Sequence, residues 1–240
     1  MEKIDGIIIN VTPYKNNNVV IGIITKNGLV AMLGRGSLKP TSPTNKYLKQ
    51  FLYGEFELYK GPLGRYSLKD CKVYDDYSNY FINYDDHMIY EFMIELCFKF
   101  MVGNPDLYGY FDLLLNVLKE YKSSINKYII PCYFFAQILK RNGSSLNFNS
   151  CVDCGNMTMI VGIDFTKGGV VCKEHATPMT RFMNKQQFSL YMALFGNNIG
   201  KIIEVKLLKI EFLQIIHDLC YLQSKNFDFN LKTIQLLESI

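Results

Sequence analysis

Apolar and polar residues alternate along the first third of the chain, with the two-residue period of half-buried β-strands. Between Tyr53 and Tyr59, Tyr and Glu occupy every second position, and Gly, Phe and Leu fill the positions between them. The pattern predicts five short strands, at residues 6–11, 19–25, 29–34, 53–59 and 66–74. Before the third strand, Asn27-Gly28 predicts a tight hairpin with positive φ at both positions. Five strands with regularly spaced turns favour an OB-fold barrel, and an SH3-like barrel is the alternative.

From about residue 85 the apolar period becomes 3.6 residues, which indicates amphipathic helices. We expect helices to begin at Asp85-Asp86-His87 and at Asp106, and further helices at residues 128–141, 186–196, 201–224 and 230–239. Residues 148–178 lack this period. The patterns predict a multidomain α+β chain, with an OB-fold β-barrel over residues 1–78 and an all-α domain over residues 79–240 that carries an insertion at about 148–178.

The insertion contains two pairs of potential metal ligands. Cys151 and Cys154 are separated by two residues, and so are Cys172 and His175. This spacing is typical of a zinc ribbon or treble clef, because a tight turn directs both side chains of a pair at one ion. Four protein ligands close the shell, so we expect a structural Zn²⁺ in a zinc finger. Buried or redox-active thiols are the alternative, and a zinc hydrolase would require an open coordination position.

Positive charge is concentrated at the N-terminus. Residues 1–72 carry eleven Lys and Arg against five Asp and Glu, a net of 11 − 5 = +6, whereas residues 73–240 carry 15 − 17 = −2. The asymmetry favours a domain that faces a polyanion, although a solvated basic surface gives the same count. We expect nucleic-acid contacts from Lys15, Lys26, Arg35, Lys39, Lys46, Lys49, Lys60 and Arg65, and base stacking on Tyr14 and Tyr47.

Short motifs occur in a particular order along three stretches of the chain. They are Gly6-Ile7-Ile8-Ile9 with Tyr14; Leu33-Gly34-Arg35-Gly36-Ser37-Leu38-Lys39 with Leu48-Lys49-Gln50-Phe51; and Leu139-Lys140-Arg141-Asn142-Gly143 followed by the Cys and His pairs. In their order and spacing these motifs resemble the RecO family of recombination mediators, and the resemblance covers nearly the whole chain. Relatives that bind a metal usually carry a fourth Cys where this chain has His175, which serves zinc equally well.

The resemblance implies an OB-fold joined to a helical domain with a zinc finger. It implies binding of single- and double-stranded DNA, strand annealing, association with RecR and with single-stranded-DNA-binding protein, and indirect help in loading the recombinase RecA. An apolar groove with a basic rim at Arg181, Lys185 and Lys206 would suit the acidic, hydrophobic end of single-stranded-DNA-binding protein, although core packing explains the same apolar pattern. The alternative function is a zinc-containing OB-fold adaptor that binds protein partners or RNA without annealing.

We expect no enzymatic activity, because the sequence has neither a Walker A loop nor a G-x-S-x-G elbow. No signal peptide precedes the first strand, and no apolar run approaches the roughly 18 residues that a membrane span needs. A cytoplasmic, nucleoid-associated protein without membrane contact is therefore expected.

Overall fold

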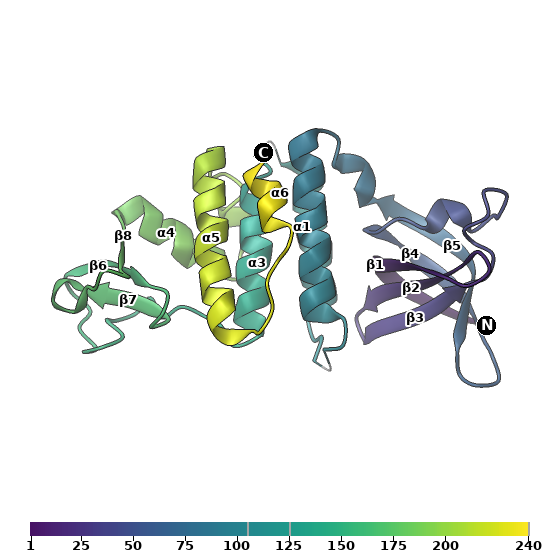
Figure 1. The fold of residues 1–240 in the computed structure, drawn as a ribbon, viewed down its shortest axis with the longest axis horizontal. Helices are drawn as coiled ribbons and strands as arrows, with labels where there is room; N and C mark the ends of the chain where they lie inside the picture. The colour runs from purple at the N-terminus through teal and green to yellow at the C-terminus, as the bar shows by residue number, and fades with distance from the viewer. Residues whose placement is uncertain (105, 125, 240) are drawn as a thin grey trace. The chain divides into compact units, whose positions relative to one another are not determined.

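The computed structural model describes residues 1–104, 106–124 and 126–239 (Figure 1). The chain forms two compact units, one of Met1–Ser123 together with the chain end from Ser239, and one of Ser124–Glu238. The residue 78 boundary expected from the sequence marks the change from strands to helices, and the division into domains 1–78 and 79–240 stays a prediction. None of the described helices is both long enough and apolar enough to span a bilayer.

The first unit contains a closed five-stranded barrel in the order β1-β2-β3-β5-β4, with β1 and β4 also paired. β3 and β5 are parallel, whereas the other neighbours are antiparallel. The predicted OB-type barrel is thereby confirmed, and the alternation in β4 buries Gly54, Phe56 and Leu58 inside it. The strands are β1 Glu2–Tyr14, β2 Asn18–Thr25, β3 Gly28–Gly34, β4 Leu52–Lys60 and β5 Tyr66–Asp76.

The hairpin turns differ from the prediction in detail. Asn16 and Asn17, with φ of 59° and 60°, form the turn with two left-handed residues between β1 and β2. At the β2–β3 turn, Gly28 has φ 109° but Asn27 does not have a positive φ. The expectation of two left-handed residues there is wrong, because a glycine that follows the turn absorbs the left-handed conformation by itself.

Two helices complete the first unit, α1 at Tyr84–Met101 and α2 at Tyr110–Ser123. Asn83 is the N-cap of α1, since its side chain accepts a hydrogen bond from the Asp86 N–H at 2.8 Å. The buried Asp86 carboxylate also accepts a hydrogen bond from the Tyr121 hydroxyl at 2.7 Å, which ties α2 to the start of α1. The helix therefore begins slightly earlier than the sequence predicts.

The second unit combines helices with a small sheet. The helices are α3 Ile129–Arg141, α4 Lys185–Leu194, α5 Lys209–Asn226 and α6 Ile234–Glu238, and the sheet has the order β7-β6-β8 with strands β6 Ile160–Asp164, β7 Gly169–Cys172 and β8 Arg181–Phe182. α3 packs beside α5 and is buried from Ile129 to Leu139 (Figure 1). α5 starts at Lys209 and not at residue 201 as predicted. The Glu211 side chain caps the helix by accepting a hydrogen bond from the Leu208 N–H. The apolar Ile202 and Leu207 precede the helix and are buried although their segment is not helical.

Candidate metal centre and nucleic-acid surface

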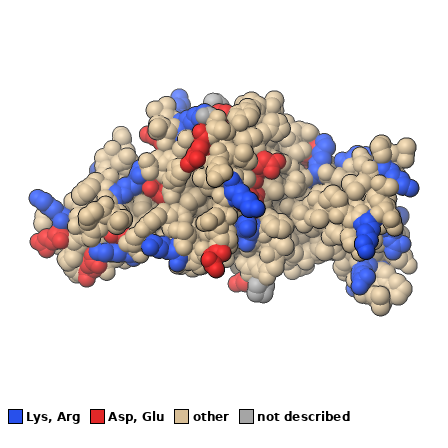
Figure 2. Space-filling view, viewed as in Figure 1, with Lys and Arg blue, Asp and Glu red and all other residues tan. Residues whose placement is uncertain are grey.

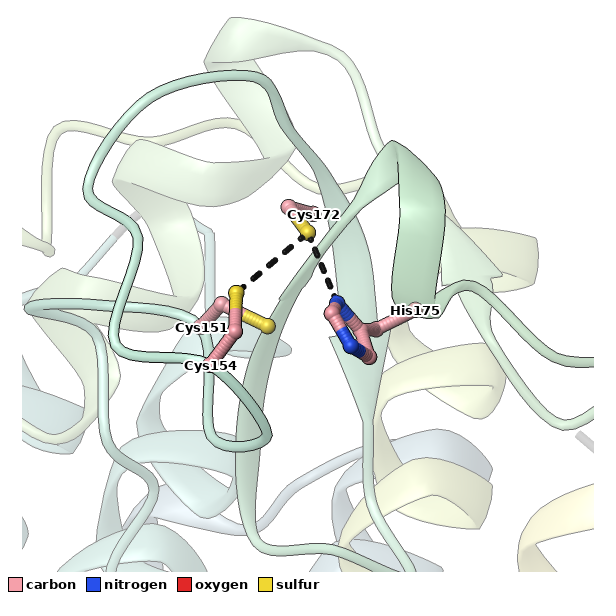
Figure 3. Close-up of side chains that lie close together, drawn as sticks. All are labelled: Cys151, Cys154, Cys172 and His175. Carbon is pink, nitrogen blue, oxygen red and sulfur yellow. Dashed lines mark hydrogen bonds between the residues drawn. The ribbon is translucent and has the colours of Figure 1, made fainter.

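Four side chains converge beside the small sheet of the second unit (Figure 3). Cys151 and Cys154 come from the turn before β6, Cys172 ends β7, and His175 lies in the single turn η3, Lys173–His175. Their ligand atoms all lie within 4.8 Å of one another. The Sγ atoms of Cys154 and Cys172 are 3.8 Å apart. Tetrahedral zinc with Zn–S bonds of about 2.3 Å requires sulfurs about 3.8 Å apart, so the donor geometry fits this ion.

The local backbone explains why the first pair of ligands converges. The Cys151 carbonyl accepts a hydrogen bond from the Gly155 N–H at 2.8 Å, and the Cys151 N–H donates to the Asn156 carbonyl at 2.8 Å. Gly155 has φ 71°, a conformation that disfavours other residues. On the second arm, the Cys172 Sγ lies 3.2 Å from the His175 Nδ1. The spacing predicted from the sequence thus places all four donors together.

The cluster has the electrostatics of a cation site. Burial raises the pKa of the Cys151 thiol, but hydrogen bonds from the backbone N–H groups of Cys172, Cys154 and Asp153 outweigh it and lower that pKa to about 6. The Asn156 N–H acts to lower the pKa of Cys154, yet burial and the two neighbouring thiols raise it. A bound cation would favour the thiolate form of the neighbouring cysteines, and the Cys₃His cluster could hold a metal ion.

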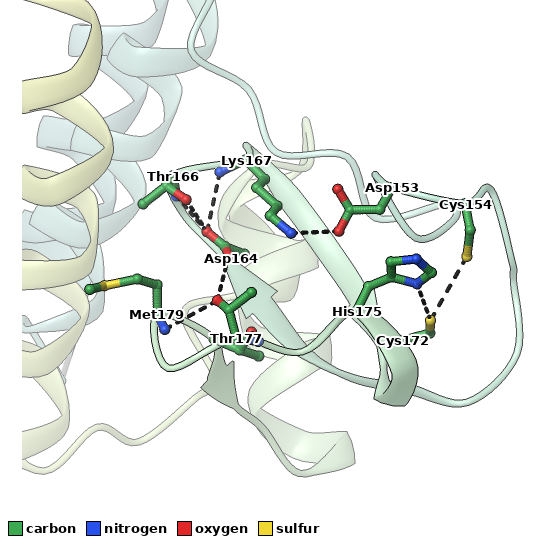
Figure 4. A network of polar contacts seen from close by, with 10 residues as sticks. Asp153, Cys154, Asp164, Thr166, Lys167, Cys172, His175, Thr177 and Met179 are labelled. Atoms are coloured by element: carbon green, nitrogen blue, oxygen red, sulfur yellow. Dashed lines mark hydrogen bonds and ion pairs between the residues drawn. The ribbon is translucent and has the colours of Figure 1, made fainter.

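A network of hydrogen bonds holds the two arms of the cluster together (Figure 4). The Asp164 carboxylate accepts hydrogen bonds from the backbone N–H groups of Thr166, at 2.9 Å, and Lys167, at 3.2 Å. It also accepts one from the Thr177 hydroxyl at 3.2 Å, close after His175. Burial acts to raise the pKa of Asp164, but these bonds and the Thr166 hydroxyl lower it. Lys167 pairs with Asp153 at 2.6 Å, which links the hairpin to the first pair of ligands.

One end of the barrel collects several predicted DNA contacts, and we call it the loop end. Here Gly34 of β3 lies opposite Val19 of β2, the Gly36 N–H donates to the Asn18 side chain at 2.8 Å, and Met32 pairs with Tyr66 at the start of β5. The β1–β2 turn and the segment after β3 therefore lie together, and the β4–β5 turn leads into the strand that pairs with the last part of β3. These segments carry Lys15, Arg35, Lys39, Lys60 and Arg65, all exposed.

Most of the loop-end cations have no acidic neighbour. Lys60 pairs with Glu2 at 3.4 Å. Within the described ranges, Lys15, Arg35, Lys39 and Arg65 form no ion pair. Figure 2 shows Lys and Arg side chains over the barrel on the face it draws. The loop end is therefore a concentrated positive surface.

The remaining candidates on the barrel lie elsewhere or have other contacts. Lys26 is in the β2–β3 turn, at the other end of β2 from the loop end. Lys49 precedes β4, likewise away from the loop end, and pairs with Asp76 at 2.7 Å. Lys46 is exposed, and its Nζ lies 4.9 Å from the centre of the Tyr47 ring.

The two tyrosines chosen for base stacking differ in accessibility. Tyr47 is 6% exposed and packs in the barrel core, with its hydroxyl bonded to Asp70 at 2.7 Å. Burial leaves its ring without an open face for a base, so the stacking role expected for Tyr47 does not fit the structure. Tyr14 is 54% exposed beside the β1–β2 turn.

A groove in the second unit brings together the three predicted rim residues. It runs between α4 and the start of α5, with Lys185, Lys206 and Glu211 along one part and Arg181 along the adjoining part. The larger part has a volume of about 620 Å³. Its apolar lining consists of Leu190, Ala193, Val205 and Leu207, and Ile210 and Ile215 continue it. That this groove binds a peptide stays a prediction.

Comparison with protein families agrees with this arrangement. A family described as "Recombination protein O N terminal" matches residues 1–77, and one described as "Recombination protein O C terminal" matches residues 88–215. The chain belongs to the Recombination protein O family. The resemblance inferred from the sequence motifs is thereby confirmed.

Curated relatives in the Recombination protein O family align over most of the chain. The DNA repair protein RecO of Exiguobacterium sibiricum is 26% identical over 80% of this chain and 80% of its own length. Its namesake from Clostridium kluyveri is 23% identical over 99% of this chain and 93% of its own length. The protein of that name from Lactobacillus delbrueckii subsp. bulgaricus is 24% identical over 74% of this chain and 72% of its own length.

Sequence reasoning missed a polar network beneath the groove of this Recombination protein O chain. Asp218 of α5 accepts hydrogen bonds from Arg181, at 3.2 Å, and from the Tyr191 hydroxyl. Burial raises the pKa of Asp218, and burial together with the Asp218 carboxylate raises the pKa of Tyr191. The available signal was an acidic residue on a helix between the apolar residues Ile215 and Leu219, which indicates a buried charge that needs a partner.

Proposed function

We propose that the chain is a recombination mediator in DNA repair, which binds single- and double-stranded DNA through the loop end and anneals complementary strands. The observation that carries the proposal is the set of four exposed cations on an OB-type barrel that form no ion pair with any residue the structure describes, namely Lys15, Arg35, Lys39 and Arg65. The β1–β2 and β4–β5 loops of OB-folds are a usual place for oligonucleotides. Membership of the Recombination protein O family and relatives named for DNA repair support it.

The loop end would act by charge neutralisation. Two complementary strands repel each other through their phosphates, and cations that bind both strands lower this repulsion. The exposed Tyr14 ring beside the same turn offers a stacking surface for a base. Lys26, Lys46, Lys49 and Lys60 then contribute less, because each is remote from the other cations or has a partner of its own.

We further propose that Cys151, Cys154, Cys172 and His175 bind a structural Zn²⁺. When bound, this ion would cross-link the turn before β6 to the end of β7, and it would leave no position for a substrate. The three thiols and the imidazole supply the donor set that zinc prefers, and the sulfur spacing supports the assignment.

The groove suits a partner with an acidic, hydrophobic chain end, and we propose the tail of single-stranded-DNA-binding protein. Lys185 and Lys206 provide positive charge, and Leu190 and Val205 provide apolar surface. RecR is a further proposed partner. We propose that the chain indirectly promotes loading of RecA onto strands coated with single-stranded-DNA-binding protein, and that it acts in the cytoplasm at the nucleoid. The alternative is an adaptor that binds protein or RNA without annealing.

The test compares two variants of the full chain. Arg35→Ala combined with Lys39→Ala removes two unpaired loop-end cations, and Lys49→Ala removes a cation that Asp76 already neutralises. Affinity for a fluorescent single-stranded oligonucleotide and the annealing rate with its complement are measured at moderate salt. We expect both to fall for the double variant and to change little for Lys49→Ala. Unchanged affinity in the double variant would refute the loop-end proposal, and a preference for competitor RNA would favour the adaptor.

A further inference from the structure

The metal centre and the groove are connected by the small sheet of the second unit. Arg181 begins β8, six residues after the ligand His175, and β8 pairs with β6 through Ile163↔Arg181 and Gly162↔Phe182. β6 pairs on its other edge with β7, where Ile160 lies opposite the ligand Cys172. The backbone of Arg181 is therefore part of the sheet that holds the metal ligands.

The contact between β6 and β8 is close. A side-chain carbon added at Gly162 would lie 2.3 Å from the Arg181 carbonyl oxygen, so the two backbones touch directly at this point. The Met183 N–H extends the pairing through a hydrogen bond to the Val161 carbonyl at 3.1 Å. The backbone position of β8 therefore depends on β6.

The side chain of Arg181 belongs to the groove. Its Nε lies 3.1 Å from the Asp218 Oδ2, and Arg181 lines the groove beside Leu190 and Ile210. The side chain is 30% exposed, so it is accessible to a carboxylate in the groove.

Part of the core of the small sheet is built from metal ligands. One buried cluster consists of Cys151, Val171 and Cys172, two of which are ligands, whereas Ile163 and Val170 of the same sheet are buried outside this cluster. Metal binding therefore contributes to the folding free energy of the side of the sheet that carries the ligands. Loss of the ion would loosen β7 and its pairing with β6, and through β6 the strand β8 that holds Arg181.

We propose that zinc at the Cys₃His cluster and an acidic peptide in the groove bind cooperatively, with Arg181 as the residue that connects the two sites. The inference rests on the proposed partner groove and adds its regulation. Partner binding is then sensitive to metal loss or thiol oxidation, and a bound peptide strengthens zinc binding by the same factor, because coupling between two sites is reciprocal.

The experiment uses the full chain and a fluorescein-labelled peptide with several aspartates and a C-terminal Phe carboxylate. We expect affinity to fall about tenfold or more when zinc is removed with a chelator, and to recover when zinc is added back. Arg181→Ala should lower affinity in the zinc-loaded protein and remove the zinc dependence. Lys206→Ala is the matched control, since it lines the groove outside the sheet: affinity should fall while the zinc dependence remains.

A second measurement covers the case in which the zinc-free protein loses helix by circular dichroism. Zinc affinity is measured by equilibrium competition with a metallochromic chelator, with and without saturating peptide, in wild type and Arg181→Ala. Tighter zinc binding with peptide in wild type alone supports the coupling. Equal peptide affinity with and without zinc, or zinc affinity that the peptide does not change, overturns the coupling and leaves the groove intact. No peptide binding by the zinc-loaded protein overturns both.

Discussion

The salt dependence of DNA affinity measures how many phosphates the loop end neutralises. Four of its cations, Lys15, Arg35, Lys39 and Arg65, are exposed without an ion-pair partner in the described part of the chain. Each phosphate contact to a single strand contributes about −0.7 to the slope of log affinity against log salt concentration, so four contacts give about −2.8. Affinity should then fall about 50-fold between about 50 mM and about 200 mM salt.

Two lysines on the β2 hairpins provide a matched pair of substitutions. Lys15 lies in the turn before β2 at the loop end, and Lys26 lies in the turn after β2 at the opposite end; both are exposed. Lys15→Ala should reduce the slope by about 0.7, to about −2.1, whereas Lys26→Ala should leave it near the wild-type value.

The assay is fluorescence anisotropy of a labelled oligonucleotide over a series of salt concentrations, with thermal melts to check that each variant is folded. Equal changes in slope for Lys15→Ala and Lys26→Ala would refute the assignment of the loop end, because charge would then act without regard to position. A wild-type slope near zero would refute phosphate neutralisation altogether.

Three further predictions concern stability and the metal. Gly54→Ala should destabilise the barrel by about 1–3 kcal/mol in urea unfolding, because the new carbon would lie 2.7 Å from the Lys72 carbonyl oxygen, while Gly22→Ala, whose nearest atom is 3.5 Å away, should change little. Asp164→Asn should lower the free energy of unfolding by about 1.5–3 kcal/mol at neutral pH. Because folding lowers the pKa of Asp164, this contribution is present above about pH 4 and is lost as the pH falls through the folded pKa. The melting temperatures of the wild type and the variant should therefore converge in acid. Chelation should release about one zinc per chain and speed proteolysis within residues 151–175, and Cys154→Ser should give the same cleavage without a chelator; unchanged cleavage would contradict a structural metal.

Local patterns accounted for the strands, most helices and the metal ligands. The alternation in β4 and the long apolar run of α3 depend on which residues face the core, and the sequence records this directly. The ligand pairs are equally local, because two intervening residues set the turn whatever surrounds it. The predicted start of α5 at residue 201 was wrong because Ile202 and Leu207 are buried in a segment that is not helical. The spacing of apolar residues cannot distinguish a buried helix from a buried irregular segment.

The features that could not be predicted from the sequence depend on contacts between residues that are far apart along the chain. The segments of Arg35 and Arg65 are connected through the parallel pairing of β3 with β5, in which Met32 lies opposite Tyr66, and no local signal specifies that register. The same topology carries Lys26 to the other end of the barrel. Tyr47 looked available for stacking, but the loop before β4 turns its ring into the core. Arg181 and Asp218, which are 37 residues apart in sequence, meet only in the folded unit.

The two proposed binding surfaces differ in how they are held in place. The loop end is carried by a closed barrel whose core contains Ile21, Ile23 and Phe56, so its geometry needs no ligand. The sheet that positions Arg181 has strands of two to five residues and a core made partly of the metal-binding cysteines. Loss of the metal should therefore leave DNA binding intact while it weakens the groove, because the ion contributes part of the free energy that holds the sheet of Arg181.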